Sequence, residues 1–246
     1  MSGPRVVVVQ SNYLPWKGYF DLISEADIFV FYDDVQFTKN DWRNRNRIKT
    51  PKGAEWITVP VGQSLDRLVC EVRIEDPRWQ AKHWRTLEQN YRRAPHFEPY
   101  RTFFEEVFLR TTWKTLSELN HHLTKTIATE FLGLRPEFRD SREFRPEGTK
   151  LDRLLSLLKQ VGAGHYISGP AAKAYIDPRA FEEANIGLEF KDYSGYPEYP
   201  QFHPPFEHAV SVIDVLFHLG REAARYTVRG KDPDSSTARS ASPGGR

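Results

Sequence analysis

Two runs of consecutive apolar residues near the N-terminus constrain the fold of this chain most strongly. Arg5–Gln10 (RVVVVQ) and Ala26–Tyr32 (ADIFVFY) are continuous rather than alternating, as is typical of strands buried on both faces of a parallel sheet. Pro15 and Gly18 interrupt the pattern between them, and Tyr19–Glu25 is expected to form a short helix. The arrangement predicts a βαβ unit with a right-handed crossover.

The sequence pattern after these strands changes first from polar to strand-like and then to helical. Thr38–Lys52 is polar and basic, with too few apolar residues for an interior element, and is expected to be a loop. Trp56–Val61 and Leu68–Ile74 resemble strands and are expected to form a hairpin or a pair of edge strands. From about residue 77 to 132 apolar residues recur at three- and four-residue steps, which predicts an insertion of two or three helices.

A second α/β stretch follows, in which Thr149 and Asp177 are suited to begin helices. In chain order we expect a strand Glu137–Asp140, a helix Lys150–Val161, a strand His165–Ser168, a helix from Asp177, a strand Ile186–Phe190 and a helix Val210–Leu219. The pattern predicts an α/β fold: a Rossmann-like, mostly parallel sheet with a helical insertion, in a single domain over residues 1–230. The Ser/Gly/Pro-rich tail over residues 231–246 is expected to be disordered.

Composition excludes several classes of protein. Lys and Arg number 35 against 33 Asp and Glu, and this net charge of +2 argues against a dedicated nucleic-acid binder. The single cysteine, Cys70, excludes a disulfide framework and a Cys-rich metal site. The chain has no apolar run long enough to span a membrane and no signal-peptide pattern at its start. We therefore expect a soluble cytoplasmic protein with no membrane partner.

The first candidate cluster is the loop after the first strand, QSNYLPWKGYF. Ligands of doubly wound sheets sit beyond the carboxyl ends of the strands, so this loop is a favoured binding place. Neither GxGxxG nor GxxxxGK[ST] occurs in it, which excludes a standard dinucleotide or P-loop site. Its candidate substrate-binding residues are Gln10, Asn12, Tyr13, Trp16 and Gly18. The alternative is that its aromatic rings only plug the end of the sheet.

The second cluster, DDVQFTKNDWRNRNRIKT, follows the second strand. It brings Asp33 and Asp34 to the same sheet edge as candidate general bases. Guanidinium groups in this segment are suited to clamp phosphate or carboxylate, and amides to bind polar substrate atoms. Its candidate substrate-binding residues are Lys39, Asn40, Trp42, Arg43, Asn44 and Arg45. The alternative is a solvated basic loop.

A third cluster lies where the strand His165–Ser168 runs into a Ser-Gly-Pro turn. Ser168, Gly169 and Lys173 could form a small anion-binding turn there, and the alternative is a plain turn. Nucleotidyltransferases of the HIGH-motif type have a comparable late turn, but their first loop carries two histidines. Here that loop reads PWKGY, so adenylyl chemistry by that mechanism is not expected.

Histidines provide the last candidates. In the loop QFHPPFEH, His203 and His208 bracket Glu207, and a His–Glu pair is a workable general base with its orienting carboxylate. These residues do not have the HExxH spacing, and no metal site is predicted. His121 and His122 lie on an expected long helix, where a core or surface role is favoured.

Four segments of the chain resemble the WbqC-like protein family, which is named after a component of bacterial O-antigen gene clusters. They are QSNYLPWKGYF from Gln10, YDDVQFTKNDWRNRNRI from Tyr32, YISGP from Tyr166 and YPQFHPPFEH from Tyr199. The resemblance extends to about residue 220, although Ser11 stands where members usually carry proline. It implies a bacterial, cytoplasmic protein associated with sugar or natural-product biosynthesis.

Together these features predict a biosynthetic transferase or amide-forming enzyme, the reaction type being implied by the resemblance. Its substrate is expected to be small, anionic and amino-bearing, such as a nucleotide-linked amino sugar or an amino-acid derivative. Two alternatives stay open: an ATP-using nucleotidyltransferase or ligase, and a non-catalytic ligand-binding partner in a biosynthetic pathway. The sequence indicates no particular cofactor and no oligomeric state.

Overall fold

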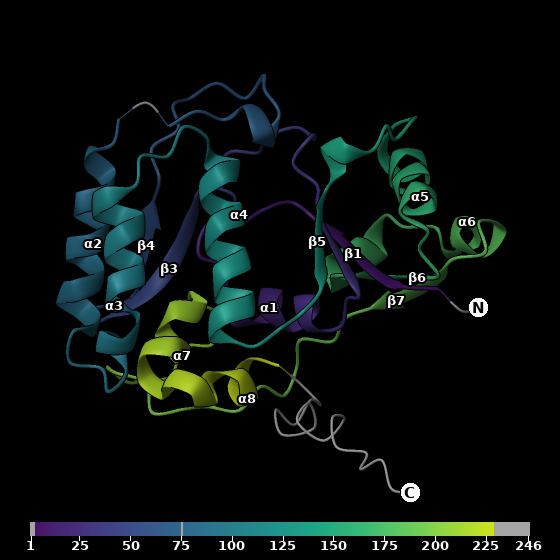
Figure 1. Ribbon diagram of the computed structural model, residues 1–246. Coiled ribbons are helices and arrows are strands. Elements are labelled where there is room, and N and C mark those ends of the chain that lie inside the picture. Colours follow the sequence, from purple (N-terminus) through teal and green to yellow (C-terminus); the bar gives the residue numbers. More distant parts are fainter. Residues whose placement is uncertain (1–2, 75, 229–246) are drawn as a thin grey trace, which may run out of the picture.

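The centre of the fold is a five-stranded parallel sheet with the strand order β5-β2-β1-β6-β7 (Figure 1). A computed structural model gives the structure of residues 3–74 and 76–228. The strands are β1 (Arg5–Val9), β2 (Ile28–Phe31), β5 (Glu137–Asp140), β6 (His165–Ser168) and β7 (Gly187–Phe190). The chain builds from β1 through β2 to β5, then crosses back to lay β6 against the other side of β1. The predicted Rossmann-like α/β fold is confirmed.

The pairing of β1 with β2 explains why both apolar runs lie inside. Val7 pairs with Phe29 and Val8 with Val30, and all four side chains are buried. Successive side chains of a strand point to opposite faces, so Val7 and Phe29 join one hydrophobic cluster while Val8 and Val30 join the other. Both faces of the sheet therefore carry a core.

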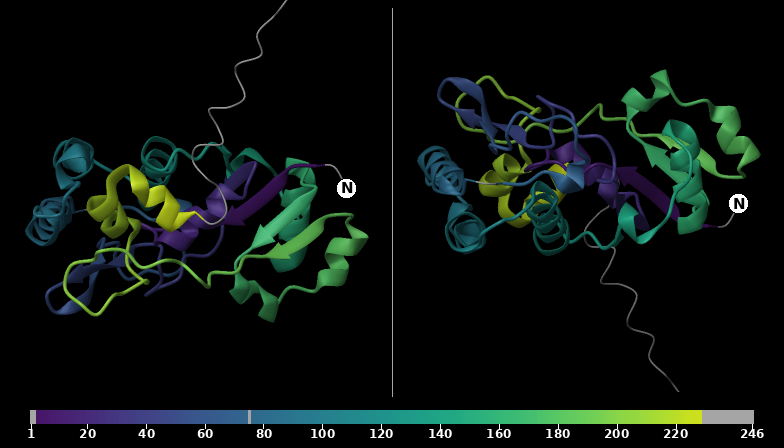
Figure 2. Two further views of the ribbon diagram at one scale, coloured as in Figure 1. Left: turned by 90° about the horizontal axis from the view of Figure 1, so that it is seen from below. Right: turned by 90° about the horizontal axis from the view of Figure 1, so that it is seen from above.

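Helices cover the two faces of the sheet (Figures 1 and 2). One cluster contains side chains of α1 (Lys17–Ser24), α4 (Leu116–Thr126) and α7 (Val212–Leu219), the last followed by α8 (Ala223–Thr227). The other contains side chains of α5 (Lys150–Val161) and α6 (Pro178–Glu183). The ends of α1, α5 and α7 lie within two residues of the predicted ones, and α6 begins one residue after the predicted Asp177. The sequence predicts no bounds for α4, and it does not predict α8.

The hairpin that follows β2 in the chain differs from the prediction. Its strands are β3 (Arg45–Thr50) and β4 (Gly53–Thr58), which pair antiparallel, so the expected pairing of Trp56–Val61 with Leu68–Ile74 is wrong. β3 lies in the segment expected to be a polar loop. It can be buried because its polar groups have partners: Asn46 Nδ2, for example, donates to the carbonyl oxygens of Tyr13 and Leu14.

The helical insertion consists of α2 (Arg78–Tyr91), α3 (Phe97–Glu105) and α4, as predicted for residues 77–132. Thr115 caps α4 by accepting a hydrogen bond from the Glu118 backbone N–H, and the Thr115 backbone N–H donates to the Glu118 carboxylate. Within the described ranges no helix is long and apolar enough to cross a membrane. The tail predicted over residues 231–246 lies outside the described residues.

Candidate functional site

A crevice of about 880 Å³ opens at the carboxyl ends of β1 and β6. These strands are neighbours in the sheet, but the chain leaves them toward opposite sides of it. The strand order reverses at this point, and open α/β sheets bind their ligands at such reversals. The predicted site residues that line the crevice are Gln10, Asn12, Trp16, Trp42, Arg43, Ser168 and Gly169.

The loop after β1 is held in place from within the crevice wall. Nη1 of Arg43 donates to the Gln10 carbonyl oxygen at 3.3 Å and to Oδ1 of Asn12. The Tyr19 hydroxyl donates to the same Gln10 oxygen at 3.1 Å. Arg43 also forms an ion pair with Asp41 at 3.4 Å. The guanidinium group thus braces the loop and places a positive charge on the crevice wall.

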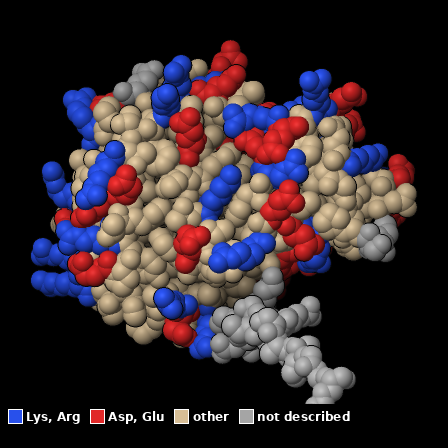
Figure 3. All heavy atoms as spheres, viewed as in Figure 1, with Lys and Arg blue, Asp and Glu red and all other residues tan. Residues whose placement is uncertain are grey.

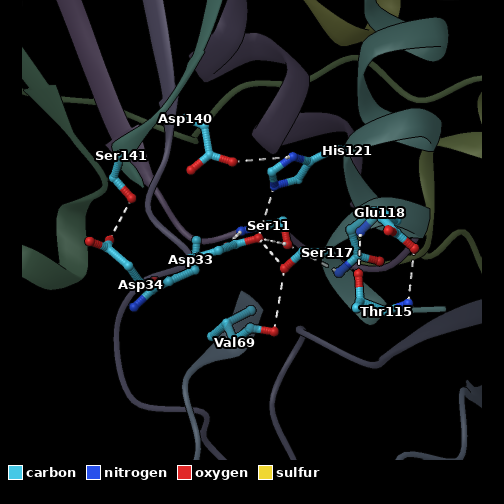
Figure 4. Close-up of polar contacts among 12 residues, drawn as sticks. Ser11, Asp33, Asp34, Val69, Thr115, Ser117, Glu118, His121, Asp140 and Ser141 are labelled. Atoms are coloured by element: carbon cyan, nitrogen blue, oxygen red, sulfur yellow. Dashed lines mark hydrogen bonds and ion pairs between the residues drawn. The ribbon is translucent and has the colours of Figure 1, made fainter. Parts of the chain in front are cut away.

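Asp33 follows β2 at the sheet edge, and its buried carboxylate accepts four hydrogen bonds (Figure 4). The donors are the Ser11 backbone at 2.8 Å, Ser11 Oγ at 2.7 Å, Ser117 Oγ at 2.6 Å and His121 Nε2 at 2.9 Å. Burial raises the pKa of Asp33. The hydrogen bond and the charge of His121 lower it, as do the hydrogen bonds from Ser117 and Ser11. Together they outweigh burial and leave the pKa of Asp33 below its ordinary value. The Asp33 carboxylate is therefore ionised at neutral pH and acts as the acceptor of these hydrogen bonds.

This network makes Asp33 a positioning residue rather than a base open to substrate. Ser11 lies between Gln10 and Asn12, both of which line the crevice. By binding Ser11, Asp33 holds this part of the crevice wall in place from the interior of the protein. Ser11 supplies Asp33 with two donors, its backbone N–H and its hydroxyl, and a proline at this position would supply neither. The sequence predicts Asp33 as a general base, and the structure places its carboxylate in the interior among these donors.

His121 reaches Asp33 from α4 and was favoured from sequence only as a core or surface residue. Its ring stacks on Phe31 at a centroid distance of 3.8 Å. Its Nδ1 lies 4.0 Å from Oδ2 of Asp140, and Arg142 pairs with the same Asp140 oxygen at 2.7 Å. His121 therefore lies between two carboxylates (Figure 4).

Asp34 holds a different part of the crevice. Its carboxylate accepts a hydrogen bond from Ser141 Oγ at 2.5 Å and pairs with Nη2 of Arg153 at 2.5 Å. Arg153 belongs to α5, and Leu151 and Leu154 of that helix line the crevice. Asp34 thus ties the wall formed by α5 to the end of β2, and its carboxylate is engaged by partners other than the predicted histidines.

A second, smaller cavity of about 290 Å³ adjoins the crevice. Asn12, Trp16 and Trp42 line both spaces, and the smaller one is completed by Pro15, Asn46 and Ala209. We call it the tryptophan pocket. The two cavities therefore share one wall.

The QFHPPFEH loop ends at the tryptophan pocket, because Ala209 directly follows it. His208 packs on Phe206 at a centroid distance of 4.6 Å, and burial and the charge of Lys17 lower its pKa. Glu207 faces Arg47 at 4.0 Å. His203 is exposed. Within the described chain, Asp33 and Asp34 are partnered by other residues, so the expected contact with His203 or His208 is corrected.

Three other predicted binding residues lie in the interior. The Tyr13 hydroxyl is 2.8 Å from Nδ1 of His83 and fully buried, and burial raises its pKa. Asn44 donates to the Val59 carbonyl oxygen at 2.9 Å. Gly18 lies in α1 against the ring of Trp16, where a Cβ would come within 2.2 Å of that ring. These residues shape the site without facing the crevice.

The remaining predicted binding residues lie on the surface outside the crevice lining. Lys39 donates to Gln63 at 2.6 Å. The Arg45 guanidinium bonds Asn40 and lies 4.2 Å from the ring centre of Trp56. Lys173 lies 5.5 Å from the ring centre of Phe190.

The prediction also missed part of the lining. Lys150, Leu151 and Leu154 line the crevice, although a helical pattern there indicated only packing. Tyr175 lines it as well and is 76% exposed. A leucine pattern alone does not distinguish a core face from a ligand-facing one.

Charge and metal-binding capacity complete the description. Acidic and basic side chains are interspersed over the face shown in Figure 3, consistent with the net charge of +2. Among residues 3–74 and 76–228, no three His, Cys, Asp or Glu side chains are grouped so that they could hold a metal ion.

Comparison with known proteins supports the resemblance noted from the motifs. The model of the WbqC-like protein family matches residues 10–226, which includes the lining of both cavities apart from Val8 and Val9. The chain belongs to the WbqC-like protein family. It is 43% identical over 224 residues to Rv1507c, described as an uncharacterized protein of Mycobacterium tuberculosis, covering 90% of this chain and 96% of that relative. No solved structure matches the chain.

Proposed function

We propose that this protein is a biosynthetic group transferase of the amide-forming type, which binds a small anionic, amino-bearing substrate in the crevice. A nucleotide-linked amino sugar is the favoured substrate class. The observation that carries the proposal is the crevice itself, a concave space at the reversal of strand order with Arg43 on its wall.

The lining suits a ligand with a ring at one end and negative charge at the other. Arg43 and Lys150 are the two Lys or Arg side chains among its described lining residues, and Ser168 adds a hydroxyl at the end of β6. Trp16 and Trp42 offer ring surfaces for stacking. Two cations matched to phosphate or carboxylate oxygens, beside aromatic rings, form the combination that a nucleotide-linked substrate requires.

Amide formation needs a base for the attacking amine. The amine nitrogen attacks the acyl carbon of a donor, the C–N bond forms as the bond from that carbon to its carrier breaks, and the amine loses a proton. His208 is the best-placed candidate of the predicted bases, because it adjoins the tryptophan pocket through Ala209. Its lowered pKa leaves its imidazole neutral, and thus able to accept the proton, near neutral pH.

The experiment is a product search by mass spectrometry. Wild-type protein is incubated with UDP-, CDP- and dTDP-linked amino sugars, each with acyl-CoA donors or with an amino acid and ATP. The proposal expects a new amide product with one of these pairs. Release of AMP or pyrophosphate without an amide would favour a nucleotidyltransferase, and tight binding without turnover by any pair would favour a binding protein.

A further inference from the structure

The tryptophan pocket stands outside the space assigned to the anionic substrate, yet shares a wall with it. Asn12, Trp16 and Trp42 face both cavities, so ligands in the two would be separated by these three side chains only. A transferase needs its two substrates side by side, because the reacting atoms must approach within bonding reach. The geometry of two adjoining cavities meets that need.

The polar groups of the pocket can be counted. Nδ2 of Asn46 donates to the carbonyl oxygens of Tyr13 and Leu14, and its Oδ1 accepts from the Arg47 backbone, so its amide is used. Oδ1 of Asn12 accepts a hydrogen bond from Arg43, so Nδ2 of the same amide points away from Arg43. Among the residues that line the pocket, the side-chain groups left without a described partner are donors: Nδ2 of Asn12 and the indole N–H groups of Trp16 and Trp42.

The walls exclude charged occupants. Pro15, Ala209 and the two tryptophans are apolar, and no ionisable side chain is among the six described residues that line the pocket. A carboxylate there would lose its hydration without gaining a cation, and an ammonium group would lose its hydration without meeting a carboxylate among the described lining residues. The volume of about 290 Å³ is near the lower limit for ligand pockets and fits a short chain or a single ring.

We infer that the tryptophan pocket binds the transferred group of the donor substrate, an uncharged short aliphatic or aromatic acyl group whose carbonyl oxygen accepts from Asn12. This inference rests on the proposed function for its meaning, because it assigns the second substrate of the same reaction. The two cavities then have different roles: the crevice binds the charged groups of one substrate, and the tryptophan pocket binds the apolar acyl group of the other.

The test uses benzamide and butyramide as neutral probes, and benzoate and butyrate as charged probes of matching shape. Binding is followed through the indole N–H signals of Trp16 and Trp42 in ¹H–¹⁵N NMR spectra of the full chain. The neutral probes should shift both signals and bind at least tenfold more tightly than their carboxylates. Equal affinity for the two kinds of probe, or signals that neither neutral probe moves, would overturn the assignment.

A pocket-filling variant makes the test specific. Ala209→Phe places a ring in the pocket, and Ala81→Phe on the exposed side of α2 is the matched control. Benzamide affinity should fall at least tenfold in the first variant and stay within twofold of wild type in the second. Should Ala209→Phe not fold, Ala209→Leu fills less of the space and should still weaken benzamide at least threefold. Unchanged benzamide affinity in a folded Ala209 variant would contradict the assignment.

The two proposals fail separately. If the amides bind as described while no nucleotide-linked sugar binds the protein, the proposed function is wrong, and the tryptophan pocket stands as a site for an uncharged group without the role of donor site. If a nucleotide-linked amino sugar binds and the amides do not, the pocket assignment alone is wrong.

Discussion

Oδ2 of Asp33 lies 2.9 Å from Nε2 of His121, 88 residues further along the chain. The pair joins the end of β2 to α4 and, through Ser11, to the loop that lines the crevice. Its carboxylate is fully buried. The contact therefore links the helical insertion to the site by electrostatics as well as by packing.

Replacing Asp33 by Asn tests this role. Above pH 5, Asp33→Asn should lower the free energy of unfolding by about 3 kcal/mol, because Ser11, Ser117 and His121 lose their charged acceptor. The pKa of Asp33 is lower in the folded state than in the unfolded chain, so its contribution is present above the unfolded pKa of about 3.9 and is lost as pH falls through the folded value. Urea unfolding at several pH values measures both effects. The exposed Asp66→Asn is the control, and equal stability of the two variants would contradict the role.

The parallel sheet and the edge chosen for the site could be predicted because local pattern indicates both. The consecutive valine side chains of β1 can all be buried only if both faces of the strand are covered, as they are inside a sheet. Parallel strands bring their carboxyl ends to one edge of the sheet. That topology predicts Gln10 and Ser168 at this edge, and both line the crevice.

The interior polar residues could not be predicted because their burial depends on distant partners. Asn46 and Lys49 of β3 are buried although both side chains are polar. The Lys49 backbone N–H donates to the Tyr91 hydroxyl at 2.9 Å, which in turn donates to Asp214 at 2.8 Å. Such chains of hydrogen bonds join segments far apart in sequence, and no local pattern marks them.

His83 should give the protein a measurable pH dependence of stability. Burial lowers the pKa of His83 to about 4, against about 6.5 in the unfolded chain. Between these values the unfolded state binds more protons, so the contribution is complete above pH 6.5 and falls with pH by up to about 1.4 kcal/mol per pH unit. His83→Gln should remove that slope from the urea stability curve, whereas the exposed His203→Gln should keep it. A wild-type slope in His83→Gln would show that other groups produce it.

Arg43 and Arg45 should now differ in their effect on ligand binding. Arg43 lines the crevice, whereas Arg45 packs on Trp56 outside the crevice lining. Arg43→Ala should weaken binding of a nucleotide-linked sugar by roughly 10- to 150-fold, the equivalent of about 1.5–3 kcal/mol for a charged hydrogen bond. Arg45→Ala should stay within threefold of wild type. Titration calorimetry measures both affinities, and equal losses would place the anion on the hairpin instead.

His208 should govern the acid side of the pH–rate profile once a turnover assay exists. Because its pKa lies below 6.5, the neutral form should persist and the rate should hold until pH falls beneath that value. His208→Gln should lower turnover by about 10²- to 10⁴-fold and remove the acid limb. An unchanged profile in this variant would remove His208 from the mechanism.

The most direct measurement of the central claim is a crystal structure of the protein grown with a saturating UDP-linked amino sugar. The account predicts the diphosphate between Arg43 and Ser168, at the carboxyl ends of β1 and β6, with the nucleotide in the crevice of about 880 Å³. A nucleotide bound at any other surface, with this crevice holding only water, would contradict it.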